Sequence, residues 1–203
     1  MTRRLIVGIS GASGFVYGQR LLQMLQPLDL EVHLVVSKSA LLTMACETHC
    51  KLADLSALAH QLHRNEDIGA SIASGSFRTL GMIVAPCSMK TLAEIATGNA
   101  GSLLSRAADV MLKERRRLVL LARETPLSLV HLRNMLSVTE MGAIVAPPVP
   151  AFYARPKDLD EMVEHTLGRV LDLFDIDSQT VRRWAGTGSR PAADAGSRSI
   201  ESA

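Results

Sequence analysis

Aromatic side chains are scarce in this sequence, at 3% of its 203 residues. They are Phe15, Tyr17, Phe77, Phe152, Tyr153, Phe174 and Trp184. The core must therefore be built from aliphatic side chains and methionine, for which a hydrophobic content of 47% is sufficient. An aromatic residue in a loop of such a chain is a candidate for a functional role.

Net charge and long apolar runs are also lacking. The 22 basic residues barely outnumber the 20 acidic ones and are spread along the chain, which argues against a nucleic-acid-binding face. No apolar run is as long as a membrane span, and no secretory signal precedes the first apolar stretch. A chain of this length suits one domain. We expect a cytoplasmic protein that binds neither nucleic acid nor membrane.

Metal-binding patterns are absent as well. The three cysteines, Cys46, Cys50 and Cys87, lack the paired spacing of a zinc site, so we expect three buried, reduced thiols. His60 and His63 form one close pair of histidines in a polar stretch. We expect both rings on the solvent face of a helix, and no metal site in the protein.

The first apolar stretch carries the strongest local signal. Residues 5–9 predict a buried β-strand, residues 15–26 predict a helix, and between them lies a turn of small residues, Gly11, Ala12, Ser13 and Gly14. The first N–H groups of a helix lack intrahelical acceptors and carry partial positive charge, so such a turn suits a phosphate. The alternative is that the glycines only let a strand turn tightly into a helix.

The spacing of the glycines argues against NAD as the ligand of this turn. Gly8, Gly11 and Gly14 do not match the dinucleotide fingerprint, which also needs an acidic residue after the second strand. Here the predicted second strand, residues 31–36, is followed by Ser37 and Lys38, which suit a further phosphate better than a ribose. NADP, with its additional phosphate, stays open at this point.

Strands and helices alternate along the rest of the chain. Apolar runs predict strands at residues 81–85, 118–122 and 143–146, and helical patterns lie at residues 40–47, 52–63, 89–96, 103–116, 127–138 and from a capping box of Asp158 and Glu161 to residue 174. This alternation predicts a doubly wound, parallel α/β sheet in residues 1–185, whose ligands bind beyond the carboxyl ends of the strands. The Gly-, Ser- and Ala-rich residues 186–203 predict a disordered tail.

A second phosphate cradle is predicted after the strand at residues 81–85. Ser88, Met89, Lys90 and Thr91 place two hydroxyls and a lysine at a helix N-terminus, with Ser88 as its cap. One mononucleotide held between this turn and the first is a simple interpretation. A capped helix with an exposed lysine is the alternative.

Many ordered blocks of the sequence together resemble the flavin prenyltransferase (UbiX-type) family, including its branch associated with phenolic acid decarboxylases. They span the chain from Arg3 to Trp184 and comprise Gly11–Gly14 with Tyr17–Gly18, Ser37–Lys38, Glu47–Thr48, Ser74–Ser76, Pro86–Thr91, Arg106–Val110, Leu112–Arg115, Arg123–Glu124, His131–Leu132, Pro147–Tyr153 and Arg169–Asp172. The number and order of these blocks make the resemblance more specific than any single motif. It implies a Rossmann-like fold.

The resemblance implies an enzyme that joins a dimethylallyl group from dimethylallyl monophosphate to reduced FMN without a metal. The product, prenylated FMN, would serve UbiD-type decarboxylases. Because the family assembles as a homododecamer with sites between subunits, the site residues need not meet within one chain. FMN would be held by Gly11, Ala12, Ser13, Ser37, Ser88, Met89, Lys90, Thr91 and Arg123. The donor phosphate would be held by Arg106, Lys113, Tyr153 and Arg169, with Glu47, Lys113, Glu124, Tyr153 and Arg169 as the catalytic residues.

Two elementary observations support this interpretation. Ionisation of an allylic C–O bond builds negative charge on the departing phosphate, which arginine, lysine and tyrosine donors stabilise. The sequence has no Asp-Asp pair, the element of the magnesium-binding motifs common in enzymes that use prenyl diphosphates, which favours a monophosphate donor.

Phe15 replaces a smaller residue usual in the family, and either crowds the helix start or lines the flavin pocket. Trp184 is a candidate for the aromatic residue that flanks the prenyl group in some relatives.

Three other functions share parts of these features. An FMN-dependent cysteine-type decarboxylase would have the same fold, but its Pro-Ala-Ser-Ala-Asn block is replaced here by Pro86–Lys90. A non-catalytic flavin carrier would explain the phosphate turns and would give no role to Lys113, Tyr153 and Arg169. An NADP reductase would leave the same three residues idle.

Overall fold

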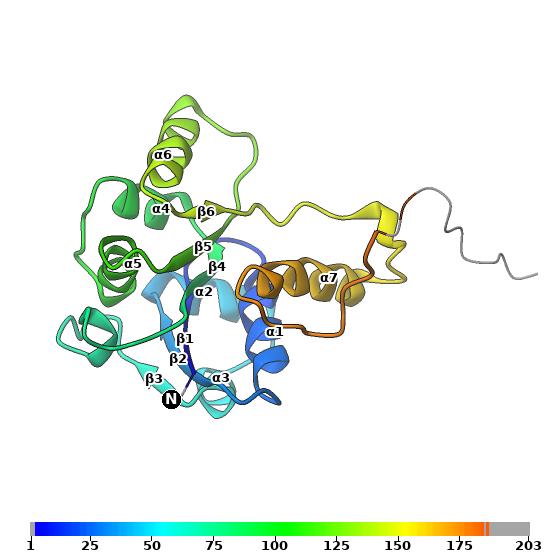
Figure 1. Cartoon of the computed structure of the whole chain (residues 1–203), viewed down its shortest axis with the longest axis horizontal. Helices are drawn as coiled ribbons and strands as arrows, with labels where there is room; N and C mark the ends of the chain where they lie inside the picture. The colour runs from blue at the N-terminus through cyan, green and yellow to red at the C-terminus, as the bar shows by residue number, and fades with distance from the viewer. Residues whose placement is uncertain (1–2, 185, 187–203) are drawn as a thin grey trace, which may run out of the picture.

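The computed structural model describes residues 3–184 and residue 186. Its centre is a six-stranded sheet in which each pair of neighbouring strands is parallel (Figure 1). The strands lie in the order β3-β2-β1-β4-β5-β6. Their bounds are β1 Arg4–Ile9, β2 Glu31–Val36, β3 Gln61–His63, β4 Gly81–Cys87, β5 Arg117–Ala122 and β6 Ile144–Val145. This order is that of a Rossmann-type doubly wound sheet, which confirms the predicted fold class.

Helices pack on both faces of the sheet. One face carries α1 (Phe15–Leu25), α2 (Lys38–Glu47), α3 (Leu52–Leu58) and α7 (Leu159–Asp172). The other carries the 3₁₀ turn η1 (Ser71–Ala73), α4 (Met89–Ala96), α5 (Leu103–Lys113) and α6 (Leu129–Glu140). A long connection from β6 to α7 runs away from the sheet and contains the 3₁₀ turn η2 (Phe152–Ala154), as Figure 1 shows.

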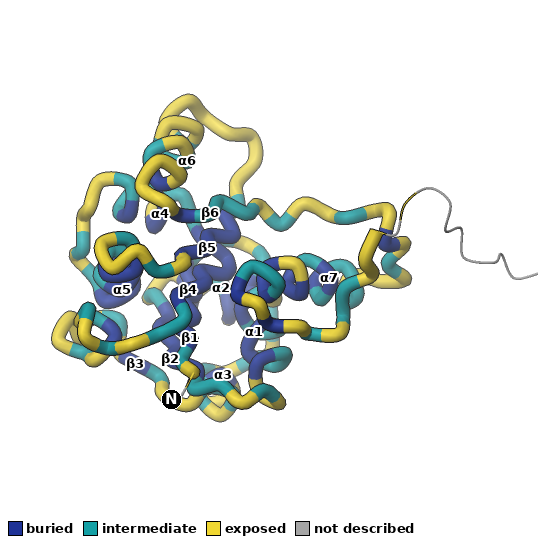
Figure 2. The backbone as a smooth tube through the Cα atoms, in the orientation of Figure 1, coloured by how far each residue is buried: buried dark blue, intermediate teal, exposed yellow. Residues whose placement is uncertain are grey.

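The strands β1, β2, β4 and β5 are apolar at almost every position because both of their faces are covered. Leu5 and Val7 pack into one core cluster, whereas Ile6, between them, packs into the other. The sheet is accordingly the most buried part of the molecule (Figure 2). Alternate side chains of a strand point to opposite faces, so a two-sided sheet needs continuous apolar runs, as these strands have.

The centre of the sheet is where the chain reverses its direction of winding. β1 pairs with β2 on one side and with β4 on the other, so that Gly8 lies between Val35 and Val84. The chain adds β2 and β3 outward from β1, and then β4 to β6 outward in the other direction. In such sheets ligands bind in the crevice at the carboxyl ends of the strands that flank this point.

Side-chain caps begin the helices that follow these strands. The Ser37 hydroxyl accepts a hydrogen bond from the Ala40 N–H at the start of α2, and the Ser88 hydroxyl accepts one from Thr91 at the start of α4. At α7 the predicted cap is present, because the Asp158 carboxylate accepts from the Glu161 N–H. The Glu161 carboxylate accepts from the N–H of Lys157, 2.9 Å away.

Part of one predicted helix is a strand. The helix predicted at residues 52–63 ends at Leu58, and Gln61–His63 form the edge strand β3 beside β2. The prediction that both rings lie on the solvent face of a helix was therefore wrong. His63 is buried in β3, and His60 is exposed but lies beyond the end of α3. The error arose because this edge strand is polar, and its buried histidine has its partner on β2.

Other predictions of burial had mixed outcomes. Cys87 is buried, Cys50 is half-buried and Cys46 is exposed, so the expectation of three buried thiols was wrong for Cys46. All three are free thiols. Phe15 is fully buried in the core on the face of the sheet that carries α1.

Within residues 3–184, no helix has both the length and the apolar character required for a membrane span. The cytoplasmic location stays a prediction. Of the tail predicted at residues 186–203, all but Gly186 lies outside the described residues.

Candidate functional site

Backbone hydrogen bonds join the ends of four neighbouring strands and so bring together residues that are far apart in sequence. The Ser37 N–H donates to the Ile9 carbonyl at 2.9 Å, and the Arg123 N–H donates to the Cys87 carbonyl at 3.0 Å. Between them the Ser88 N–H donates to the Ser10 hydroxyl at 2.7 Å. The ends of β2, β1, β4 and β5 are therefore aligned in one row, as predicted for the ligand-binding edge of the sheet.

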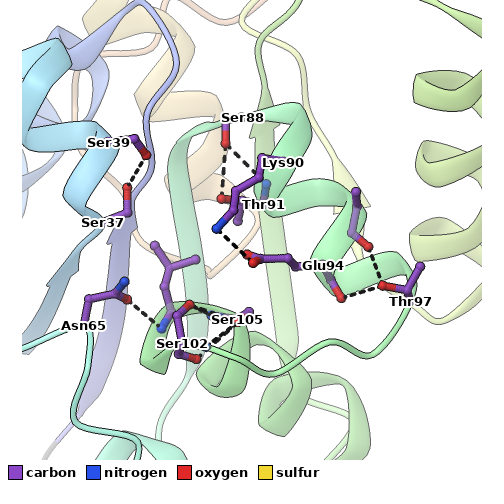
Figure 3. Close-up of polar contacts among 12 residues, drawn as sticks. Ser37, Ser39, Asn65, Ser88, Lys90, Thr91, Glu94, Thr97, Ser102 and Ser105 are labelled. Atoms are coloured by element: carbon purple, nitrogen blue, oxygen red, sulfur yellow. Dashed lines mark hydrogen bonds and ion pairs between the residues drawn. The ribbon is translucent and has the colours of Figure 1, made fainter.

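Two helix N-termini with hydroxyl caps face this row. At α2 the hydroxyls of Ser37 and Ser39 lie 3.1 Å apart, and at α4 the hydroxyls of Ser88 and Thr91 lie 3.2 Å apart. Figure 3 shows the two hydroxyl pairs on opposite sides of the same space. In the described part of the chain, the N–H groups of the first two residues of each helix have no hydrogen-bond acceptor. Unpaired N–H groups and hydroxyls are the donor set that a phosphate requires.

The Lys90 ammonium forms an ion pair with Glu94 on the same helix, at 2.9 Å, and most of the lysine side chain is exposed. In Figure 3 this side chain runs from α4 toward the side on which Ser37 and Ser39 lie. At the helix N-terminus Lys90 also offers a backbone N–H that has no acceptor among the described residues. Its role in FMN binding stays a prediction, beside the alternative of a capped helix with an exposed lysine.

The small-residue turn after β1 lies in close contact with the start of α2. A Cβ atom on Gly11 would lie 2.4 Å from the Ser39 Cβ and 2.8 Å from the Ser39 backbone carbonyl carbon. Only glycine allows this approach, which brings the turn up to the N-terminus of α2. Ser39 was missed by the sequence reasoning, and its position after the predicted Ser37-Lys38 pair was the available signal.

The N-terminus of α1, the first predicted phosphate cradle, is filled by a carboxylate of the protein itself. A Glu47 carboxylate oxygen accepts hydrogen bonds from the N–H groups of Gly14, at 2.9 Å, and Phe15, at 2.8 Å. These are the donors that an anion would need at this helix. The N-termini of α2 and α4, in contrast, keep N–H groups that have no acceptor among the described residues.

The same contacts keep Glu47 ionised. Partial burial raises the pKa of this carboxyl, but hydrogen bonds from the Ser13 hydroxyl and from the N–H groups of Phe15 and Gly14 lower it, and the positive charge of Arg123 lowers it further. The balance places the pKa of Glu47 below its ordinary value. Glu47, Ser13 and Arg123, predicted separately to lie at the flavin, thus belong to one electrostatic unit.

A groove of about 310 Å³ lies beyond the end of β6. Its lining includes Pro147, Val149, Tyr153, His165, Thr166 and Arg169. The Tyr153 ring contacts His165 and Trp184 edge to face, with ring centroids 5.7 and 5.8 Å apart. Arg169 pairs with Asp172 at 2.6 Å and about half of its side chain is exposed. Tyr153 and Arg169, predicted to bind one phosphate, are thus neighbours in a groove with apolar walls.

Lys113 and Arg106 lie elsewhere on the chain. Lys113 ends α5 and pairs with Glu114, and its Nζ atom would lie 2.8 Å from a Cβ on Gly75. Since β5 begins at Arg117, paired with the first residue of β4, this end of α5 is at the amino edge of the sheet. Within the described residues, no hydrogen bond or ion pair joins Lys113 to the Tyr153 groove or to the strand-end row.

The remaining predicted residues have local partners. Arg106 pairs with Asp109 one turn along α5, at 2.7 Å. Glu124, beside Arg123 at the end of β5, is exposed and accepts a hydrogen bond from the N–H of Thr125 at 3.0 Å. One chain therefore brings together the predicted FMN set with Glu47, and separately Tyr153 with Arg169, but it does not complete the donor set.

The donors at the strand-end row fit an FMN phosphate. Hydroxyls, unpaired N–H groups and one guanidinium are present. In the described part of the chain, no three or more His, Cys, Asp or Glu side chains are grouped so that they could hold a metal ion.

Comparison with known proteins identifies the family. The Flavoprotein family model matches residues 1–181. Flavin prenyltransferase UbiX of Neisseria meningitidis serogroup B is 56% identical over 186 residues, covering 92% of this chain and 98% of that protein. UbiX of Escherichia coli K12 is 54% identical over 187 residues, covering 91% of this chain and 99% of that protein.

Two solved structures agree with this result. AnUbiX (PadA1), crystallised with FMN and dimethylallyl pyrophosphate, has a TM-score of 0.90 and 52% identity, covering 92% of this chain and 99% of its own. A dodecameric FMN-dependent UbiX-like decarboxylase from Escherichia coli O157:H7 has a TM-score of 0.88 and 52% identity, covering 90% of this chain and all of its own. The chain belongs to the flavin prenyltransferase family of flavoproteins.

Proposed function

We propose that this protein joins a dimethylallyl group from a dimethylallyl phosphate to reduced FMN, and that the prenylated FMN is passed to a UbiD-type decarboxylase. The observation that carries the proposal is the pairing of two different phosphate-binding arrangements in one chain. The strand-end row offers hydroxyls and N–H groups, and the Tyr153 groove offers a phenol and a guanidinium against apolar walls. A flavin carrier would need only the first.

The FMN phosphate is assigned to the space between the N-termini of α2 and α4. There the hydroxyls of Ser37, Ser88 and Thr91 and the N–H groups of Met89 and Lys90 would hold it. Gly11, Ala12 and Ser13 would form the wall beside the flavin, and Arg123 would add positive charge. FMN supplies the nucleophile of the reaction, and these residues bind and orient it.

Glu47 is assigned to the orientation of the flavin wall. Its carboxylate is held by Gly14, Phe15 and Ser13, so it is ionised at neutral pH and fixed in position. Glu124 lies at the end of the neighbouring strand and is exposed. We assign both carboxylates to proton handling at the flavin.

The Tyr153 groove is assigned to the prenyl donor. Breaking the allylic C–O bond leaves negative charge on the departing phosphate, and the Tyr153 hydroxyl and the Arg169 guanidinium would stabilise that charge. The apolar walls, with Pro147 and Val149, suit the hydrocarbon group. Lys113 and Arg106 would reach the site from other subunits of a homododecamer, because their own chain places Lys113 at the opposite edge of the sheet.

A monophosphate donor agrees with this arrangement better than a diphosphate. A diphosphate carries more charge, and enzymes that use it commonly bind it through magnesium held by paired aspartates, which this sequence lacks. A tyrosine and a few cationic side chains suffice for one phosphate. AnUbiX (PadA1) was crystallised with the pyrophosphate, so both donors belong in the test.

The test is anaerobic incubation of the protein with reduced FMN and either dimethylallyl donor, followed by mass spectrometry of the extracted flavin. A mass increase of one prenyl unit, faster with the monophosphate, is the expected result. Flavin of unchanged mass with both donors would refute the proposed function. Equal rates with the two donors would refute only the donor assignment.

A further inference from the structure

A buried serine that the proposed mechanism does not use links the two central strands at the ligand-binding edge. Ser10 follows β1 and is fully buried. Its hydroxyl donates a hydrogen bond to the Pro86 carbonyl at 2.9 Å and accepts one from the Ser88 N–H at 2.7 Å. The Ser10 N–H also donates to the Pro86 carbonyl, at 3.2 Å. Ser10, directly after β1, is therefore hydrogen-bonded both to Pro86 near the end of β4 and to Ser88 directly after it.

These bonds determine where α4 begins. Ser88 is the N-cap of that helix, and its own hydroxyl is occupied by the N–H and hydroxyl of Thr91. The Ser88 N–H is directed at Ser10, so the cap residue is fixed from its backbone by Ser10 and from its side chain by Thr91. The next residue after Ser10 is Gly11, which contacts Ser39 at the start of α2. Ser10 is thus linked to the start of α4 by its own hydrogen bonds and to the start of α2 through its neighbour Gly11.

We infer that Ser10 is a positioning residue for FMN, and that its hydroxyl fixes the distance between the N-termini of α2 and α4 at which a phosphate fits. The inference rests on the proposed function, since it assigns the FMN phosphate to that space. Ser10 does not contact the phosphate: it acts through Ser88. Its effect is therefore on the phosphate of FMN and not on the flavin ring.

Only a hydroxyl can serve at this position. It is donor and acceptor in one atom, and both of its partners are backbone groups close to the axis of the sheet. In Ser10→Ala the Ser88 N–H loses its acceptor where little water can replace it, and the start of α4 is free to shift. Ser10→Thr keeps the hydroxyl and should keep the position.

A matched control joins the same two strands at their other ends. The Thr79 hydroxyl, which is partly buried, donates to the carbonyls of Arg4 at 2.9 Å and Gly81 at 3.0 Å, and accepts from the Gly81 N–H at 3.2 Å. Thr79→Ala therefore removes a hydroxyl link between β1 and β4 at the amino edge, away from the proposed phosphate. It reports the effect of weakening the β1–β4 pair without touching the start of α4.

The experiment compares FMN with riboflavin, which has the same ring and no phosphate. Dissociation constants of both are measured by flavin fluorescence for wild type, Ser10→Ala, Ser10→Thr and Thr79→Ala. We expect Ser10→Ala to weaken FMN binding at least about fivefold and riboflavin binding less than about twofold. Ser10→Thr and Thr79→Ala should keep the wild-type ratio of the two constants.

The outcomes separate this inference from the proposed function. Failure of the wild type to bind FMN would refute the proposed function. FMN bound normally by Ser10→Ala, or FMN and riboflavin weakened equally, would refute the positioning role while leaving the function intact. If Ser10→Ala does not fold, Ser10→Cys replaces it, since sulfur keeps the shape but is a much weaker acceptor, and the same ratio decides.

Discussion

A buried pair of histidines makes the stability of this protein dependent on pH below neutrality. His33 of β2 and His63 of β3 are both buried, and the His33 Nδ1 and His63 Nε2 atoms lie 3.0 Å apart. In the described structure, the His33 Nε2 atom is buried without a hydrogen-bond partner. One nitrogen of the close pair must donate and the other accept, which two neutral rings allow and two charged rings do not.

The pKa of His33 is lowered from an ordinary 6.5 to about 4, mainly by burial and then by the neighbouring His63, while Glu31 opposes the shift. Burial also lowers the pKa of His63, and Asp67 opposes it. His60 and Arg4, the other charged groups around His33, act in the same direction as His63. In the unfolded chain these two histidines therefore become protonated near pH 6.5, whereas in the folded chain they become protonated only at lower pH.

The sign and size of the effect follow from this difference. Between the two pKa values the unfolded state binds more protons, so the free energy of unfolding falls as the pH falls. For His33 alone the loss between pH 7 and pH 5 is about 2 kcal/mol, and its contribution is complete above the unfolded pKa. His63 adds a loss of the same sign.

The assay is urea denaturation at fixed protein concentration from pH 5 to pH 7, for wild type, His33→Leu and His60→Gln. His33→Leu replaces the ring by an aliphatic side chain, and should reduce the loss of stability over this range by about 2 kcal/mol. His60→Gln removes an exposed histidine of the same segment. Because burial and His63 lower the pKa of His33 more than His60 does, this variant should keep most of the wild-type slope. A His33→Leu protein with the wild-type pH dependence would refute the reasoning.

Three further predictions concern the site. Glu47→Gln should destabilise the fold by about 1 kcal/mol at neutral pH, because the α1 N-terminus loses a partly screened charge; the difference from wild type in urea denaturation should vanish at acidic pH, where Glu47 is protonated. Gly11→Ala should displace the start of α2 and weaken FMN binding at least about tenfold in fluorescence titration. Gly69→Ala is the control and should leave FMN binding unchanged, because an added Cβ there meets only ordinary contacts. Arg169→Ala should raise KM for the prenyl donor at least about tenfold while FMN affinity stays unchanged. Arg3→Ala, which removes an exposed arginine before β1, is the control and should match the wild type in the same kinetic assay.

The elements that could be predicted from the sequence are those determined by patterns of neighbouring residues, such as apolar runs and helix caps. Continuous apolar runs identified β1, β2, β4 and β5 because a two-sided sheet buries every residue of a strand. β3 was missed because its polar residues gave no such run, and the partner that accommodates His63 is on another strand, 30 residues earlier. Hydroxyl caps were predictable at Ser88 because a cap acts on its own helix.

The site was predictable in its members more than in its arrangement. The turn at Gly11–Ser13 lies at the carboxyl edge of the sheet, as predicted, but the carboxylate of Glu47, 33 residues from Gly14, accepts the hydrogen bonds that the turn alone offered to a phosphate. Ser10 gave no local signal, since its partners are 76 and 78 residues away. Contacts of this kind depend on the order of the strands, which local patterns do not determine.

The separation of Lys113 from Arg169 within one chain leads to a prediction about assembly. If each site takes Arg169 from one subunit and Lys113 from another, Arg169→Ala and Lys113→Ala oligomers should each have little activity at prenyl-donor concentrations far below the raised KM, because every site lacks one phosphate-binding side chain. Oligomers that contain both variants are different. At equal amounts, Arg169 is intact in half of the chains and Lys113 in the other half, so about one quarter of the sites contain both side chains. Unfolding and refolding the two variants together should therefore restore about a quarter of the wild-type rate of flavin prenylation, whereas mixing without refolding should restore none. If Arg169 and Lys113 of a site came from the same chain, no mixture could recover activity. A refolded mixture without recovered activity would therefore establish that arrangement instead.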